Sequence, residues 1–171
     1  LSQGIALEGI SIIKKHLQRS FSNGDDIEAR GNMLAASSMG SIAFQKGLGA
    51  IHSLSHPVGA LYNTHHGLTN AVFMPYVLKK NKEAIEGKLI AVTRYIGLSN
   101  QSFDGFMKWI LYLRESLNIP HTLKDLIGED VKLDSKPTYS QALTFAFTYV
   151  KLAPSLPTSM AAKWWRNVDK Q

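Results

Sequence analysis

Apolar side chains recur along most of this chain at steps of three and four, which is the spacing of one face of an α-helix. The clearest case runs from Ser2 to about Ser20, and its apolar stripe consists of Ala6, Ile10, Ile13, Leu17 and Phe21. No alternation of apolar and polar residues between hairpin turns, the pattern of half-buried strands, stands out. The sequence therefore predicts an all-α, multi-helix domain of about six to eight helices over residues 1–171.

The remaining helix boundaries follow from turn and helix-ending residues. Residues 22–25 form an expected turn, and a second helix is expected over 26–45. Its stretch 35–44 is rich in small residues, so we expect it to be buried on most sides. The other expected helices span 67–78, 82–96, 104–117 and 138–152. Three features are expected to end or kink helices: Pro75, Gly97 and the Asn118–Pro120 segment.

The composition is that of a folded protein and narrows the possible functions. Hydrophobic residues make up 44% of the chain and charged residues 19%, and cysteine is absent. Disulfides and thiolate–metal sites are therefore excluded, which leaves imidazole and oxygen ligands and is compatible with a cytoplasmic location. No apolar run reaches the roughly 20 residues of a membrane span, and no cleavable signal is visible, so we expect no membrane partner.

The net charge of +6 raises the question of nucleic-acid binding. The basic residues are scattered as pairs and single sites, without an aromatic-interleaved stripe or a recognition-helix motif. We therefore expect no nucleic-acid partner. The pair Trp164–Trp165 is assigned to a core edge or a domain seam rather than to base stacking. An acidic part of the protein missing from this chain would also explain the imbalance.

Four of the six histidines lie in the run 51–67, which reads I-H-S-L-S-H-P-V-G-A-L-Y-N-T-H-H-G. Histidine is both a neutral metal ligand and a proton carrier near pH 7, so this run suggests a metal or proton-transfer site. Metal sites usually take three or four protein ligands, often including a carboxylate. No acidic residue lies between Arg30 and Asn81, so the run suggests half a site.

The spacing of these histidines leaves two interpretations open. His52 and His56 are four apart and share a helix face, but Pro57 is expected to end or bend the helix and leave 58–64 irregular. His66 then returns toward the same place from the start of another helix, with Gly59 and Gly67 permitting a close backbone approach. The alternative is that one or two histidines are partly buried and bonded to backbone carbonyls, with the rest solvated.

The stretch 43–74 resembles the central motif of the iron-containing alcohol dehydrogenase family, whose fold is dehydroquinate synthase-like. That motif pairs H-x-x-x-H-P-x-G with H-G ten residues after its second histidine, as 52–59 and 66–67 do here. The segment 106–123 also resembles the family, and the resemblance covers roughly residues 1–125. It implies that residues 1–171 are a C-terminal helical metal-binding domain, and that the N-terminal NAD(P)-binding α/β domain is absent from this chain.

The resemblance also implies roles for four side chains. The family's metal ligands are one Asp and three His, of which the Asp and the first His lie upstream of this chain. The other two ligands map onto His52 and His66, and His56 maps onto a histidine near the nicotinamide and the substrate oxygen. Phe44 lies near the family's aromatic substrate-pocket wall. No role in the site is implied for the other histidines, which are His16, His65 and His121, and we expect His16 and His121 to lie at the surface.

The implied activity is metal-dependent hydride transfer between an alcohol or aldehyde and NAD(P), with Fe²⁺ or Zn²⁺ as the cofactor. Since half the ligands and the nucleotide domain are missing, we expect this chain to be an inactive fragment. Its exposed faces are expected to favour a homo-oligomer or aggregation. The alternatives are a polyol (glycerol-type) dehydrogenase, a maleylacetate reductase-like relative, and a non-catalytic basic helical interaction module.

Overall fold

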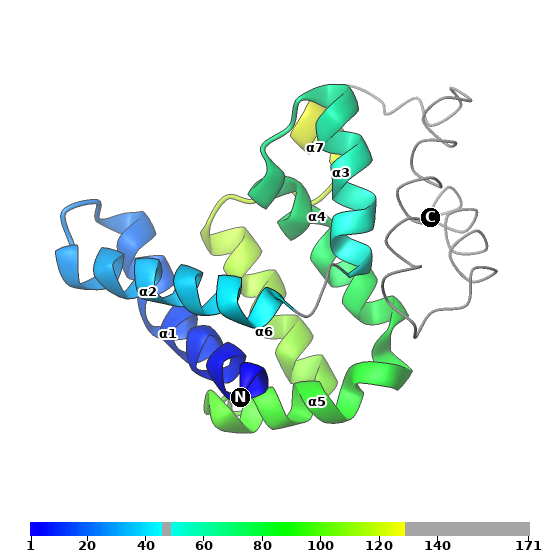
Figure 1. Ribbon diagram of the computed structural model, residues 1–171. Helices are drawn as coiled ribbons and strands as arrows, with labels where there is room; N and C mark the ends of the chain where they lie inside the picture. The colour runs from blue at the N-terminus through cyan, green and yellow to red at the C-terminus, as the bar shows by residue number, and fades with distance from the viewer. Residues whose placement is uncertain (46–48, 129–171) are drawn as a thin grey trace. The chain divides into compact units, whose positions relative to one another are not determined.

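A computed structural model describes residues 1–45 and 49–128, so the helix expected over 138–152 lies outside the described residues. All regular structure in those two ranges is helical, which confirms the all-α prediction (Figure 1). The described helices are α1 (Ser2–Ser22), α2 (Ile27–Phe44), α3 (Ala50–Tyr62), α4 (His66–Lys80), α5 (Lys82–Tyr95), α6 (Phe103–Ser116) and α7 (Leu123–Ile127). The short helix α7 has no counterpart in the sequence-based prediction.

The helices divide into two compact units. The first contains residues 1–45 and 78–119, with α1, α2, α5 and α6. The second contains residues 49–77 and 120–128, with α3, most of α4 and α7. None of the described helices has the combined length and apolar character that a membrane span requires.

In the first unit, α1 and α2 form a helical hairpin, seen at the blue end of the ribbon in Figure 1. A β-carbon built on Gly9 would lie 3.5 Å from the Met39 β-carbon, so the two backbones approach closely. Ala29 and Ala36 are buried on α2, but the rest of 35–44 is exposed or half-buried. The predicted burial of 35–44 on most sides is therefore wrong for this chain, because α1 covers one face of α2.

The helices α5 and α6 end at the residues that the sequence predicts. Gly97 has φ +65, and the amide of Leu98 donates to the carbonyl of Thr93 at 2.9 Å. Asn118 has φ +53, and the amide of Ile119 donates to the carbonyl of Arg114 at 2.9 Å. Both ends have the hydrogen bonds of a Schellman motif, in which a left-handed residue closes the helix. The predicted helix ends at Gly97 and Asn118 are confirmed.

The second unit is held together by an apolar cluster from its three helices. Its buried members are Leu54 and Val58 on α3 and Phe73 and Val77 on α4. Half-buried residues pack against this cluster, and α7 supplies two of them: Leu123 and Ile127. Burying a side chain of this size contributes about 1.5–3 kcal/mol, so the cluster is sufficient to fix α3 against α4.

The predicted end of the helix at Pro57 is wrong. α3 continues through Pro57 to Tyr62, and the irregular connection is limited to residues 63–65. A proline inside a helix costs about 3 kcal/mol because it removes one backbone hydrogen bond. Pro57 and the adjacent Val58 are both buried, and packing of this kind compensates for the lost bond. Pro75 likewise lies inside α4 and is not the boundary of that helix.

Candidate metal centre

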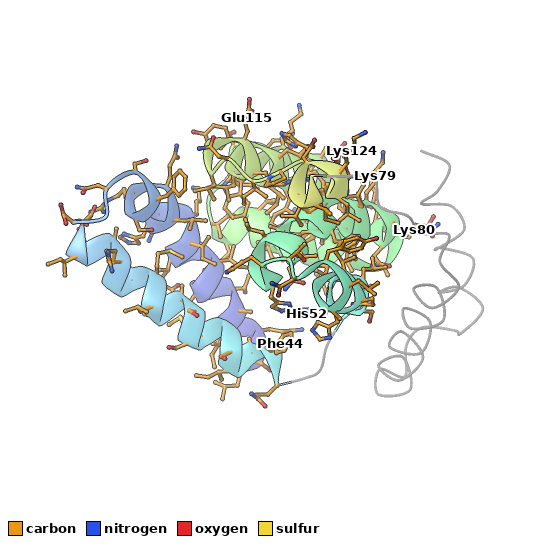
Figure 2. All side chains as sticks on the ribbon, turned by 90° about the horizontal axis from the view of Figure 1, so that it is seen from above. Phe44, His52, Lys79, Lys80, Glu115 and Lys124 are labelled. Atoms are coloured by element: carbon orange, nitrogen blue, oxygen red, sulfur yellow. The ribbon has the colours of Figure 1, made fainter. Side chains whose placement is uncertain are left out.

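Three of the four clustered histidines bring their rings together in the second unit. His52 and His56 lie one turn apart on α3, and His66 is the first residue of α4, as the sequence led us to expect. The ring centroid of His52 lies 5.7 Å from that of His56 and 5.3 Å from that of His66, and the His56–His66 distance is 5.3 Å. In Figure 2, His52 is labelled on the α3 ribbon.

The connection from α3 to α4 places His66 beside α3. Asn63 closes α3 with φ 50, a left-handed conformation that Asn adopts more readily than most residues. Neither glycine makes a close backbone approach here: a β-carbon on Gly59 would lie 3.9 Å from the Thr64 carbonyl oxygen, an ordinary contact, and one on Gly67 would meet the His65 side chain. The expected need for glycine at these two positions is therefore wrong, and Asn63 makes the turn instead.

His65 caps the helix that carries His66. Its Nδ1 accepts a hydrogen bond from the backbone amide of Leu68 at 3.3 Å, and its carbonyl accepts one from the amide of Thr69 at 3.0 Å. These are the contacts of a helix N-cap, which satisfy backbone amides that have no partner within the helix. The exposed side chain of His65 thus has a structural role outside the group of three rings.

The Nε2 atoms of His52 and His66 face the same atom. Nδ2 of Asn70 lies 3.4 Å from Nε2 of His52 and 3.0 Å from Nε2 of His66. An amide nitrogen only donates, so each Nε2 accepts and presents a lone pair toward this shared point. Both lone pairs therefore point toward one place, where a cation would meet them once the amide is displaced.

Asn70 is held in place from α3. Its Oδ1 accepts a hydrogen bond from Oγ of Ser55 at 2.5 Å, and Ser55 is 1% exposed. Neither Ser55 nor Asn70 was predicted from the sequence to lie in the site. The available signal was their spacing, since Ser55 follows His52 by three residues and Asn70 follows His66 by four, which puts each on the same helix face as its histidine.

Burial and mutual repulsion favour the neutral forms of two of the rings. The pKa of His52 is lowered from its ordinary value, first by burial and then by the neighbouring His66 and His56. The pKa of His56 is lowered by burial and by His66. Neutral imidazole is the form that binds metal ions, so these directions suit a metal centre.

The described residues fit half of a metal site. Nε2 of His52 and Nε2 of His66 are two nitrogen donors that face one point, and imidazole nitrogen suits both iron and zinc. Within residues 1–45 and 49–128, no group of three or more His, Asp or Glu side chains is arranged to hold a metal ion. Structural and catalytic zinc sites use three or four protein ligands, so a complete site needs donors from outside these residues.

The remaining residues considered in the sequence are Phe44, His121 and His16. Phe44 ends α2 in the first unit and is 43% exposed. His121 is exposed, as expected, and its carbonyl accepts a hydrogen bond from the Tyr76 hydroxyl at 3.1 Å. His16 on α1 is half-buried rather than fully at the surface, and its Nδ1 lies 3.5 Å from a guanidinium nitrogen of Arg19.

The fold and the histidine group define an all-α domain with a partial imidazole site, and comparison with known proteins gives its family. The chain belongs to the Fe-containing alcohol dehydrogenase family, since the model of the C-terminal part of that family matches residues 1–146. This result confirms the resemblance that the histidine motif indicated.

Named relatives and solved structures agree with the family. The chain is 49% identical over 88 residues to a 4-hydroxybutyrate dehydrogenase of Cupriavidus necator, covering 48% of this chain and 23% of that protein. It is 32% identical over 129 residues to alcohol dehydrogenase 4 of Saccharomyces cerevisiae, covering 74% of this chain and 34% of the yeast protein. A 1,3-propanediol oxidoreductase structure matches 84% of this chain and 39% of its own, with a TM-score of 0.74 and 28% identity. The chain thus spans well under half the length of these relatives.

Proposed function

We propose that this chain is the helical metal-binding part of a longer NAD(P)-dependent dehydrogenase that interconverts small alcohols and aldehydes. The observation that carries the proposal is the convergence of the His52 and His66 Nε2 atoms on a single atom, Nδ2 of Asn70. Membership of the Fe-containing alcohol dehydrogenase family supports it. The remaining ligands and the nucleotide-binding α/β domain belong to the part of the parent that this chain lacks.

In this proposal His52 and His66 hold a divalent cation through Nε2. The bound cation supplies Lewis acidity, which lowers the pKa of an alcohol hydroxyl. Iron and zinc both suit imidazole ligands with a carboxylate, so the donor set is compatible with Fe²⁺ or Zn²⁺. NAD(P), whose binding site the parent would supply, would provide the hydride acceptor for the alcohol carbon.

His56 is proposed as the proton carrier. Its ring lies 5.7 Å from the His52 ring and 5.3 Å from the His66 ring, measured between centroids. Because its pKa is lowered, His56 is neutral near pH 7 and able to accept the proton that the alcohol loses. It is half-buried, so it can pass that proton on to solvent.

The names of the relatives suggest a substrate class. They include an NAD-dependent methanol dehydrogenase of Bacillus methanolicus, an NADPH-dependent butanol dehydrogenase of Clostridium saccharobutylicum and a 1,3-propanediol dehydrogenase of Citrobacter freundii. We therefore propose a small alcohol or diol as the substrate, with Phe44 contributing to its pocket. The diol relative favours the polyol alternative over a maleylacetate reductase-like activity. We further propose that the parent is a homo-oligomer located in the cytoplasm.

Substitution of the three histidines in the full-length parent tests this function. His52→Ala and His66→Ala are expected to remove most of the bound metal and to abolish alcohol-dependent reduction of NAD(P). His56→Ala is expected to keep the metal and to lower kcat by about 10²–10⁴-fold, the usual contribution of a positioned acid–base group. Metal content is measured by elemental analysis and turnover by nicotinamide absorbance, with His121→Ala as the control. Full metal content and activity in the His52 and His66 variants would favour the non-catalytic interaction module instead.

A further inference from the structure

We propose that Asn70 is a positioning residue, which holds His52 and His66 in one tautomer and aims both Nε2 lone pairs at a shared point. The link from this arrangement to metal binding rests on the proposed function. The hydrogen-bond arrangement itself is independent of that function.

The two contacts of Asn70 determine which tautomer each ring adopts. Nδ2 of Asn70 carries two N–H groups and no acceptor, and it lies 3.4 Å from Nε2 of His52 and 3.0 Å from Nε2 of His66. A neutral imidazole has one N–H, so a ring whose Nε2 accepts must carry its proton on Nδ1. One amide group therefore selects the same tautomer in both rings. This is the tautomer whose Nε2 binds a cation once the amide releases it.

Ser55 anchors the side-chain amide of Asn70. The Ser55 hydroxyl, at 2.5 Å from Oδ1 of Asn70, turns the oxygen of the amide toward α3 and its nitrogen toward the two rings. Ser55 is 1% exposed and lies on α3, whereas Asn70 lies on α4, one turn after His66. The hydrogen bonds from Ser55 to Asn70, and from Asn70 to His52 and His66, thus link both helices and both rings. The arrangement of the rings does not require a cation to be present.

The same two hydrogen bonds bear on metal binding. A cation takes the Nε2 lone pairs that Nδ2 of Asn70 uses, so it must displace the amide from both rings. The tautomer that the amide selects is the one that a cation needs, since both rings then carry their proton on Nδ1. Asn70→Ala is therefore expected to remove this selection of tautomer at His52 and at His66.

Nitrogen-15 NMR of the imidazole nitrogens tests the proposal directly. The spectra are recorded on the 171-residue chain at about pH 8, where imidazoles with an ordinary pKa near 6.5 are neutral. In the unaltered chain, His52 and His66 are expected to show the Nδ1–H tautomer. Asn70→Ala is expected to shift both rings toward Nε2–H, and Ser55→Ala to do so in part. Asn70→Asp, which replaces the donor by an acceptor, is expected to reverse the tautomer.

The controls are Asn32→Ala and Ser53→Ala, whose side chains bond backbone carbonyls within α2 and α3. They are expected to leave both tautomers unchanged. The Nε2–H tautomer at both rings of the unaltered chain would overturn the proposal, and this measurement needs no variant to fold. An unchanged tautomer in folded Asn70→Ala would overturn it as well.

Addition of Zn²⁺ to the same samples separates this proposal from the proposed function. If His52 and His66 are ligands, their Nε2 resonances shift on addition of Zn²⁺, whereas the His121 resonances do not. If the tautomers respond to Asn70 but Zn²⁺ shifts neither ring, the metal role fails and the positioning by Asn70 stands. If Zn²⁺ shifts the resonances of both rings but the tautomers do not change in Asn70→Ala, the metal role stands and the positioning role of Asn70 fails.

Discussion

Burial and the crowding of three imidazole rings make protonation of His52 and of His56 unfavourable. The ring centroids lie 5.3–5.7 Å apart, so a second positive charge would meet the first at short range. Burial lowers the pKa of His52 and of His56 before that repulsion is added. The folded chain therefore binds protons at these two rings less readily than the unfolded chain does.

This difference predicts a dependence of stability on pH in the metal-free chain. As pH falls below about 6.5, the unfolded chain takes up protons on these two histidines while the folded chain does not. The free energy of unfolding is therefore highest above that pH and declines as pH falls toward the lowered pKa values of the folded state. Urea unfolding at pH values between 8 and 5 measures it. The double variant His52→Gln/His56→Gln should show a shallower decline, whereas His121→Gln should retain the full one.

Gly105 is expected to tolerate no side chain. It is buried in the first turn of α6, and a β-carbon there would overlap the backbone carbonyl of Asn100. Gly105→Ala is therefore expected to destabilise the chain by about 1–3 kcal/mol or more, as overpacking does. Gly87 is the matched control, because it is exposed inside α5 with nothing within 4 Å of a β-carbon. Gly87→Ala should stabilise by up to about 1 kcal/mol. Equal unfolding midpoints for both variants would contradict this reading.

The individual residues of the site were only partly predictable. The histidine spacing predicted that His52, His56 and His66 lie together, because histidines are rare enough for a cluster of them to stand out. Ser55 and Asn70 are common polar residues, and their role depends on which faces of α3 and α4 meet. Which helix faces meet is a property of tertiary packing, so no local sequence pattern predicts it.

At the scale of helices, boundaries set by backbone conformation were predictable and one set by packing was not. Gly97 and Asn118 end their helices because their conformations oppose continuation, and the local sequence carries that information. Pro57 disfavours a helix by a similar local argument, yet α3 continues because Leu54 and Val58 are buried against α4. A penalty of about 3 kcal/mol is comparable to the burial of one or two such side chains, so the outcome depends on the core.

The left-handed position after α5 gives a test at this scale. Gly97→Ala places a β-carbon in a conformation with φ +65, which is expected to cost about 1–2 kcal/mol. Asn118 occupies the equivalent position after α6 with φ +53, so Asn118→Gly should be neutral or slightly stabilising. Thermal unfolding followed by circular dichroism compares the two variants with the unaltered chain. A Gly97→Ala chain that melts at the same temperature as the unaltered chain would show that α5 does not depend on this cap.

For the whole molecule, the helical class and the family were predictable, but the division into two compact units was not. The first unit joins residues 1–45 to 78–119, so its definition rests on contacts between distant segments. Helical periodicity reports which residues face a core but not which core they face. The same limit explains the wrong expectation for α2, where the small residues of 35–44 indicated burial on most sides.

The outward face of α2 instead carries apolar side chains that this chain leaves in solvent. Ile27 is 82% exposed, Leu34 72% and Ile42 56%, and their spacing of seven and eight places them on one face of the helix. An exposed apolar surface of this kind favours association, so the isolated chain is expected to self-associate as its concentration rises. Leu34→Glu and Ile42→Glu should each weaken association by about tenfold or more, since burial of one such side chain contributes about 1.5–3 kcal/mol. Sedimentation velocity over a concentration series measures the effect, with the exposed Gln18→Glu on α1 as the charge control. Association that is equally strong in all three variants would place the contact on another surface, and a strictly monomeric unaltered chain would show that this face does not drive assembly.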